Sequence, residues 1–268
     1  MARKSKWWLG SLSAASLAWA DECSDYLTRA KQAFEARTFA VAAAEFERAA
    51  DVCPQRAQVL VSLGQVQILI GKEIEAEESL KSAIELQPRG TEALYALGRL
   101  YSQQKRHPEA VALLRKVVEI EPAHHRAWDN LGVNYDAMNQ DADALRSFFR
   151  ALDLVMKQHP SYDWAHANLA DFFIRRNEFE KAFQLAAEAA KRNPQSARNC
   201  FLTGKALVKM NKQELSLRWL ERATELDAEY SEAWYLLSQA YRKQGREAEA
   251  AKALGKFREL QKSAEPKR

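Results

Sequence analysis

Small residues recur at one position of an amphipathic helical pattern along almost the whole chain. Successive members are 34 residues apart, except for one interval of 38, and are Ala30, Gly64, Gly98, Gly132, Ala170, Gly204 and Ser238. Large apolar residues stand three or four positions away, as Trp128 and Tyr135 do around Gly132. Because residues at this spacing share one face of a helix, the pattern predicts an amphipathic helix around each small residue.

A second series of small residues follows the first by twelve positions. It consists of Ala42, Ala76, Ala110, Ala144, Ala182, Ser216 and Ala250. The two series predict a pair of antiparallel helices in each repeat, in which the small residues let the two backbones approach closely. Helices shorter than about 15 residues are marginal in isolation, so stacking of the pairs has to stabilise them.

Prolines mark the places where one predicted repeat ends and the next begins. They are Pro54, Pro88, Pro122, Pro160 and Pro194, and only the interval from Pro122 to Pro160 is four residues too long. Four residues are about one turn of helix, so the second helix of the fourth repeat is predicted to be one turn longer than its counterparts. The four extra residues are interpreted as a neutral change in helix length, in preference to a ridge with a role in function.

The third and fourth repeats carry the residues of a known pattern. The fourth has Trp128, Leu131, Gly132 and Tyr135, followed by Ala144, Phe148 and Ala151, and the third has Pro122 near its end. This order resembles the tetratricopeptide repeat family, whose repeat is a helix pair of 34 residues. The resemblance implies an all-α fold, a right-handed superhelical α-solenoid of antiparallel helix pairs.

The repeats account for nearly all of the sequence. We expect the array to cover residues 23–264, with a tail at 265–268 and repeats at 23–56, 57–90, 91–124, 125–162, 163–196, 197–230 and 231–264. This division leaves no room for a catalytic domain. The apolar residues, 47% of the chain, are then distributed along a continuous one-dimensional core.

Residues 1–20 have a different composition and are predicted to be a secretory signal peptide. Arg3, Lys4 and Lys6 precede a short apolar stretch, and Ala18-Trp19-Ala20 resembles a cleavage site before Asp21. The apolar stretch is shorter than the roughly 20 residues that span a bilayer. The expected location is therefore the bacterial periplasm, with no stable membrane insertion after cleavage, and the alternative is a membrane anchor formed by an uncleaved N-terminus.

Export would reduce the net charge. Loss of the three cations takes the formal charge from +4 to +1, since residues 1–20 contain no acid. A nucleic-acid-binding protein is expected to carry a strong basic stripe, whereas these charges are interspersed. Nucleic acid is therefore not an expected partner.

Two of the cysteines could form a disulfide in the oxidising compartment that export would imply. Cys23 begins the first repeat and Cys53 lies near its end, so two antiparallel helices would bring them together. We predict a disulfide between them, with two buried thiols as the alternative. Cys200 replaces a core aromatic residue and is expected to contribute to packing.

Catalytic and metal-binding patterns were not found. The adjacent His124 and His125 cannot converge on one helix face, and the other histidines are scattered over different repeats. The sequence contains no G-x-S-x-G motif and no glycine-rich phosphate loop. We expect neither an enzyme, nor a metal site, nor a cofactor.

The resemblance implies that a protein or peptide segment binds along the concave face formed by the first helix of each repeat. At the family's groove positions, or beside them, this sequence has Tyr95, Arg99, Asp129, Asn130, Asp136, Trp164, Asn168, Asp171, Arg198, Phe201, Lys205, Lys209, Tyr235, Arg242 and Lys243. The acids lie in the middle repeats and the cations toward the C-terminus, which favours a dipolar partner segment. The residues match neither the family's carboxylate clamp nor its asparagine ladder.

Three functions remain open. The favoured one is an exported, non-enzymatic scaffold or adaptor. The alternatives are a holdase-like periplasmic chaperone and a non-catalytic regulatory subunit of a separately encoded enzyme. Homo-oligomerisation stays open as well, because the ends of a repeat array need polar outer faces to remain monomeric.

Overall fold

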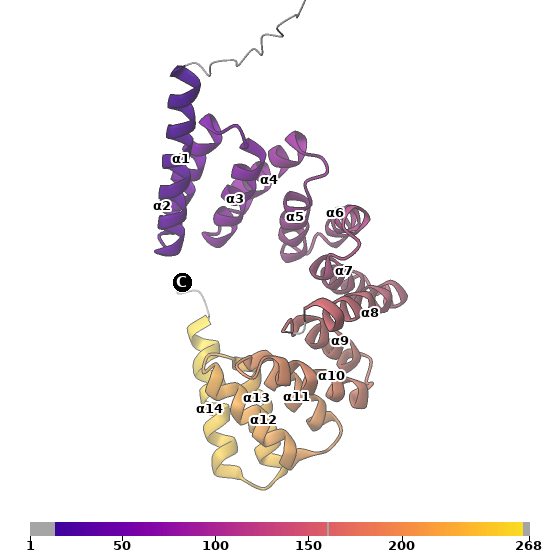
Figure 1. Cartoon of the computed structure of the whole chain (residues 1–268). Helices are drawn as coiled ribbons and strands as arrows, with labels where there is room; N and C mark the ends of the chain where they lie inside the picture. The colour runs from indigo at the N-terminus through magenta and orange to yellow at the C-terminus, as the bar shows by residue number, and fades with distance from the viewer. Residues whose placement is uncertain (1–13, 160, 265–268) are drawn as a thin grey trace, which may run out of the picture. The chain divides into compact units, whose positions relative to one another are not determined.

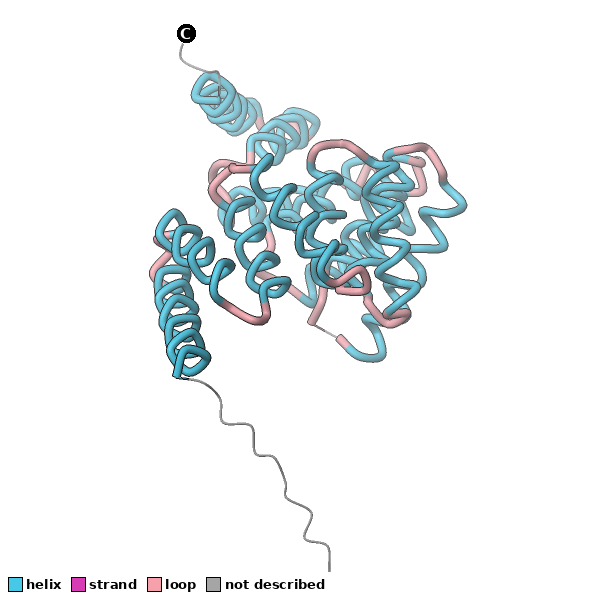
Figure 2. The backbone as a smooth tube through the Cα atoms, turned by 90° about the horizontal axis from the view of Figure 1, so that it is seen from above, coloured by secondary structure: helices cyan, strands magenta, loops and turns pink. Residues whose placement is uncertain are grey.

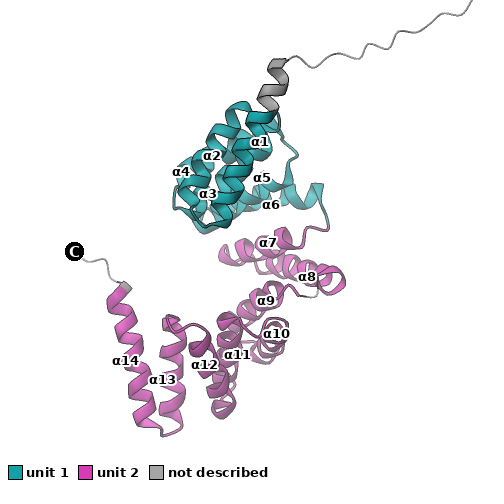
Figure 3. Cartoon of the chain, turned by 60° about the vertical axis from the view of Figure 1, so that its left-hand side comes forward, with its two compact units in different colours: residues 1–122 teal, residues 123–268 magenta. Residues whose placement is uncertain are grey.

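The computed structural model describes residues 14–159 and 161–264, and this part of the chain is helical, without strands (Figures 1 and 2). It divides into two units, residues 1–122 and 123–268 (Figure 3). Unit 1 contains α1 (Ala14–Glu35), α2 (Phe39–Val52), α3 (Arg56–Leu69), α4 (Glu73–Leu86), α5 (Thr91–Gln103) and α6 (His107–Ile120). Unit 2 contains α7 (His125–Ala137), α8 (Asp141–Gln158), α9 (Trp164–Arg175), α10 (Phe179–Arg192), α11 (Ala197–Lys209), α12 (Gln213–Leu226), α13 (Ser231–Lys243) and α14 (Glu247–Ala264).

Helices pack as consecutive pairs within each unit. The odd-numbered member of a pair is called here the A helix and the even-numbered member the B helix. Each A helix packs against the B helix that follows it, and that B helix packs against the next A helix of the same unit. The prediction of an all-α array of helix pairs is confirmed.

The predicted signal peptide falls mostly outside the described residues. Residues 1–13 are not described, and neither is the predicted tail at 265–268. Helix α1 begins at Ala14 and continues through the predicted cleavage site after Ala20. Cleavage there remains a prediction.

The small residues of the first series lie where each A helix meets its B helix. A Cβ atom added to Gly132 would lie 2.4 Å from Cδ1 of Phe148, and one added to Gly64 or Gly204 would lie 2.7 Å from Cγ of Leu80 or Leu220. Phe148, Leu80 and Leu220 are themselves fully buried. The absence of a side chain on the A helix therefore creates the space that a large residue of the B helix fills.

The turn between A and B helices has the same backbone conformation in every pair. One residue has positive φ at each turn, namely Arg37, Gly71, Lys105, Asn139, Asn177, Asn211 and Gly245, which are 34 residues apart except for the interval of 38 between Asn139 and Asn177. The next residue donates its N–H to a carbonyl five positions back, as Gln140 does to Tyr135 at 2.9 Å. This Schellman geometry satisfies carbonyls at the end of the A helix and reverses the chain.

Helix α8 has the extra turn that the sequence predicted. It contains 18 residues, whereas the preceding B helices α2, α4 and α6 contain 14 each. Its C-terminal extension leads to His159, whose ring lies 4.0 Å from that of His125 at the start of α7. The longer α8 thus ends beside the start of α7, its partner in the same helix pair.

A disulfide joins Cys23 in α1 to Cys53, the C-cap of α2. Both residues are buried, and their Cα atoms are 5.0 Å apart. The bond closes a loop with a sequence separation of 30. A loop of this length corresponds to roughly 3 to 4 kcal/mol of stabilisation in the chain-entropy model, so the bond holds the first helix pair of the array closed.

Substitution of Gly132 by alanine tests the contact between A and B helices. The new methyl group would overlap the ring of Phe148, so we expect Gly132→Ala to lower the free energy of unfolding by about 1 to 3 kcal/mol. The matched control is Gly98→Ala, where the nearest atom, Cγ of Leu114, is 3.1 Å away. Alanine also raises helix propensity by about 1 kcal/mol, so the control should be near neutral. Equal effects in urea unfolding would contradict this account.

Candidate partner-binding face

The predicted groove residues are divided between the two units. Tyr95 and Arg99 lie on α5 in unit 1, where the guanidinium of Arg99 is 5.8 Å from the ring centroid of Tyr95. All the others lie on A helices of unit 2. The surface formed by α7, α9, α11 and α13 is called here the A-helix face of unit 2.

A buried carboxylate forms the centre of a polar network on this face. Asp129 of α7 is 2% exposed, and its Oδ2 accepts hydrogen bonds from Nδ2 of Asn168 at 2.9 Å and from the hydroxyl of Tyr162 at 3.1 Å. Its other oxygen, Oδ1, is buried and has no hydrogen-bond partner among the residues that the structure describes. Burial raises the pKa of Asp129 to about 6, although the two hydrogen bonds act in the opposite direction.

The network continues from α9 to α11. The Oδ1 atom of Asn168 accepts a hydrogen bond from Nη2 of Arg198 at 2.8 Å. The guanidinium of Arg198 also lies 5.1 Å from the ring centroid of Trp164, which is 52% exposed. Three consecutive A helices therefore present one connected set of side chains, and its outer part is an aromatic ring beside a cation.

The remaining acids of the predicted set are paired within the chain. Asp136 contacts both Arg175 and Arg176, and Asp171 contacts Arg175. Arg176 also binds Asp141, with Nε of the arginine 3.1 Å from Oδ2. The middle repeats do contain the acids that the sequence indicated, but Asp136 and Asp171 are ion-paired within the chain to Arg175 and Arg176.

The cations toward the C-terminus differ from these acids. Lys205 lies 5.5 Å above the ring of Phe201, while Lys209, Arg242 and Lys243 are exposed. In the described part of the chain, none of these four side chains forms an ion pair with a carboxylate. This part of the face therefore keeps its positive charge.

Two aromatic residues of the predicted set have structural contacts. Phe201 is only 6% exposed and lies against Tyr230, with ring centroids 4.9 Å apart. Tyr235 is 45% exposed, and its ring lies 5.1 Å from that of Phe257 in α14. Phe201 therefore belongs mainly to the core, and Trp164 is the more accessible aromatic of this face.

Asn130 plays a local role in α7. Its Nδ2 donates to the carbonyl of Arg126 at 2.8 Å, which is a bond within one helical turn. The side chain is partly exposed. The backbone oxygen of Asn130 in turn accepts a hydrogen bond from Nδ2 of Asn134 at 2.8 Å.

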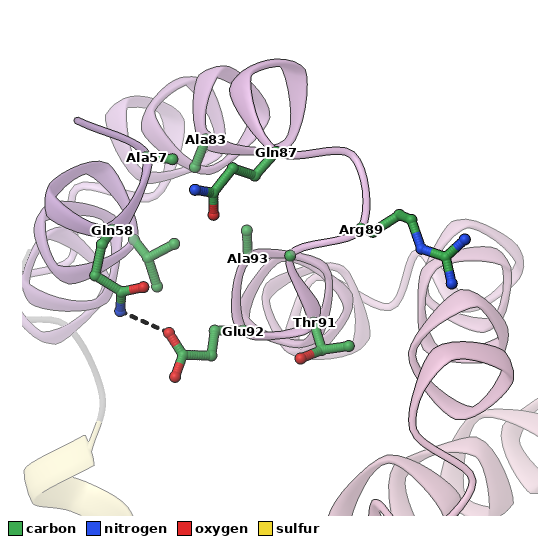
Figure 4. Close-up of a pocket in the computed structure, with 10 residues that line it drawn as sticks. Ala57, Gln58, Ala83, Gln87, Arg89, Thr91, Glu92 and Ala93 are labelled. Atoms are coloured by element: carbon green, nitrogen blue, oxygen red, sulfur yellow. Dashed lines mark hydrogen bonds between the residues drawn. The ribbon is translucent and has the colours of Figure 1, made fainter. Parts of the chain in front are cut away.

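A shallow pocket occurs in unit 1, between α3, the end of α4 and the start of α5 (Figure 4). Its volume is about 240 Å³, and Gln58 and Glu92 form a 2.6 Å hydrogen bond at its edge. Figure 4 shows the guanidinium of Arg89 directed away from the other labelled side chains. The hydroxyl of Thr91, which lines the pocket, donates a hydrogen bond to the carboxylate of Glu121.

The described residues contain neither a metal-binding cluster nor a membrane-spanning helix. No group of three or more histidine, cysteine or acidic side chains there has a geometry that could hold a metal ion. Within the same residues, every helix is too short or too polar to cross a bilayer. Cys200 is a buried thiol, and burial raises its pKa.

Comparison with protein families identifies the array. Two family models, each described as tetratricopeptide repeat, match residues 71–132 and 201–259. The chain is a tetratricopeptide repeat protein. No curated protein matches the sequence.

Solved structures of other proteins share the fold. A tetratricopeptide repeat protein from Parabacteroides merdae has a TM-score of 0.70 and 16% identity, over 90% of this chain and 93% of that chain. PilF of Pseudomonas aeruginosa has a TM-score of 0.65 and 19% identity, over 79% of this chain and 94% of that chain. YrrB, a tetratricopeptide repeat protein with an unusual peptide-binding site, has a TM-score of 0.52 and 19% identity, over 70% of this chain and 95% of that chain.

Sequence reasoning missed three side chains that define the face of this tetratricopeptide repeat protein. Arg175 and Arg176 pair with its acids, and Tyr162 binds Asp129. The i, i+4 spacing of Asp171 and Arg175 could have indicated one ion pair. The contacts from Asp129 to Tyr162 and Asn168 join residues 33 and 39 positions apart, so no local pattern signals them.

Replacement of Asp129 by asparagine tests the buried charge. The raised pKa means that the folded state binds a proton before the unfolded state does, so lowering the pH from 7 to 4 should stabilise the wild type relative to Asp129→Asn. We expect the difference between their free energies of unfolding to change by an amount on the order of 2 to 3 kcal/mol. Urea unfolding at both pH values measures it.

His125 and His166 do not confound this comparison. Burial lowers the pKa of each to about 4, so both destabilise the fold as the pH falls below their ordinary pKa. They are present in both proteins and cancel in the difference. A difference that stayed constant with pH would contradict the assignment of a buried, titrating Asp129.

Proposed function

We propose that this tetratricopeptide repeat protein is a non-enzymatic adaptor that binds a partner segment on the A-helix face of unit 2. The observation that carries the proposal is the pair formed by exposed Trp164 and Arg198, beside cations without carboxylate partners. Aromatic residues and arginine are the usual anchors of protein interfaces. The polar network from Asp129 to Arg198 holds these anchors in place before a partner arrives.

Preorganisation favours this face over the other predicted positions. Arg198 is held both by the ring of Trp164 and by Asn168, so little side-chain freedom is left to lose on binding. YrrB, which shares the fold, is described as having a peptide-binding site. The resemblance in fold is consistent with a peptide-binding role here.

The expected chemistry at the face is recognition without bond making. Trp164 offers apolar area, and Arg198 offers donors that a carboxylate or carbonyl can accept. The amide of Asn168 fixes the position of Arg198. These roles suit a scaffold that gathers other proteins.

We further propose that the protein acts outside the cytoplasm. The signal-like residues 1–20 and the disulfide between Cys23 and Cys53 support export, since disulfides persist in oxidising compartments. An adaptor in the bacterial periplasm would assemble proteins of the cell envelope.

Intact mass spectrometry tests export. Protein recovered without reduction from fractionated native cells should begin at Asp21 and be lighter by the two hydrogens lost when Cys23 and Cys53 are joined. Reduction should restore that mass and make both thiols open to alkylation. A full-length, fully reduced chain would refute export and direct the search for partners to the cytoplasm or to a membrane-anchored assembly.

A holdase-like chaperone is the second candidate, favoured by the exposed ring of Trp164. An adaptor should capture one partner in a fixed ratio, whereas a holdase should capture many unfolded proteins. Competition by unfolded model proteins would therefore favour the holdase. A catalytic chain that co-purified in a fixed ratio would instead indicate a regulatory subunit.

Substitutions on the A-helix face test the proposed function. We expect the triple variant Trp164→Ala, Lys205→Ala and Arg242→Ala to lose most of the partner capture seen with the wild type after cross-linking in cells. Phe201 is left unchanged because it is buried, and its loss would disturb folding. Quantitative mass spectrometry of the captured proteins supplies the measurement.

The matched control removes one aromatic residue and two cations from B helices. Phe149→Ala, Arg218→Ala and Lys252→Ala are all at exposed positions on α8, α12 and α14. The control should retain capture, and both triple variants should keep the helical circular dichroism signal. If the A-helix variant captured partners as well as the wild type, this face would not be the binding site.

A further inference from the structure

We infer that the A-helix face of unit 2 accepts an acidic, extended segment of a partner protein. The inference rests on the proposed adaptor function and specifies the chemistry of its partner. It differs from the dipolar segment that the sequence favoured, because the acids of this face are not available to a ligand.

Each of those acids is either buried or ion-paired within the chain. Asp129 is 2% exposed and accepts from Asn168 and Tyr162. Asp136 lies between Arg175 and Arg176, and Asp171 is paired with Arg175. A positively charged segment would have to displace these internal arginines to reach a carboxylate, which disfavours a basic partner.

The cations of the same face are available. Arg198 contacts the neutral amide of Asn168 and the ring of Trp164, and Lys205 lies above the ring of Phe201. Lys209, Arg242 and Lys243 are exposed at the ends of α11 and α13. Glu232 is an exposed acid in the first turn of α13 but is outnumbered by these five cations. Among the described residues, this face therefore has an excess of accessible positive charge, which complements an acidic segment.

Helix stability alone does not explain these positions. Cations in the last turn of a helix interact favourably with the helix macrodipole. This interaction explains the positions of Lys209, Arg242 and Lys243. Arg198 lies in the first turn of α11, where the macrodipole disfavours a cation. Lys205 lies in the middle of α11, where the macrodipole has little effect. The positions of Arg198 and Lys205 therefore support a role in binding a partner.

The spacing of the A helices sets the spacing of the partner's charges. Neighbouring packed helices are about 8 to 10 Å apart, and an extended chain advances about 3.3 Å per residue. Successive A helices are therefore about three residues apart along a bound strand. The expected segment carries a carboxylate at about every third residue, with an apolar side chain positioned to contact Trp164.

Synthetic peptides test this chemistry with the full-length protein. The probe is a fluorescent peptide of about nine residues with glutamate at every third position and leucine between. Two further peptides carry lysine or glutamine in place of glutamate. Fluorescence anisotropy should show binding of the acidic peptide, weakening as ionic strength rises, and much weaker binding of the other two.

Charge-matched variants locate the binding site. Lys205→Ala, Lys209→Ala and Arg242→Ala together should weaken acidic-peptide binding by about tenfold or more. The control triple, Arg218→Ala, Lys252→Ala and Arg258→Ala, removes the same charge from exposed positions on α12 and α14 and should bind as the wild type does. Trp164→Ala should also weaken binding without any change in net charge.

The outcomes separate this inference from the proposed function. Equal or tighter binding of the lysine or glutamine peptide, absence of acidic-peptide binding, or equal losses in the two triple variants would overturn the acidic partner. If the A-helix variant of the capture experiment still lost its natural partners, the adaptor function would stand with a partner of different chemistry. If capture were unchanged in that variant, the adaptor face itself would be refuted.

Discussion

The structure depends on the close contact between a small residue of each A helix and a large residue of the following B helix. Gly132 and Phe148 show its physical basis, since a Cβ on the glycine would fall within the ring's contact distance. Burial of Phe148, Leu80 or Leu220 supplies hydrophobic stabilisation that short helices lack on their own. Without these contacts the helices would have neither a fixed partner nor a fixed register.

The turn between the helices supports the same contact. A residue with positive φ and a Schellman hydrogen bond reverse the chain at the same point in each pair. Asn139, Asn177 and Asn211 tolerate this conformation, whereas Arg37 and Lys105 adopt it at some cost. Adoption of an unfavourable conformation by Arg37 and Lys105 indicates that tertiary packing, more than local preference, fixes the turn.

The A-helix face shows how one buried charge organises a surface. Asp129 loses hydration on burial and recovers part of that loss through Asn168 and Tyr162. The orientation of Asn168 then directs its oxygen to Arg198, which lies beside Trp164. The proposed binding surface is thereby held in one arrangement by a network that starts from a buried carboxylate.

The sequence by itself determined the fold of this protein. Helix pairs, their period and the longer helix α8 follow from the spacing of small and apolar residues, because helix packing repeats with the chain. The sequence also indicated which A-helix positions to inspect. Only the tertiary structure decided which of those side chains are available, since Asp136 meets Arg175 and Arg176 from another repeat and Phe201 is covered by Tyr230. Such contacts depend on packing between repeats, so a local sequence pattern does not predict them.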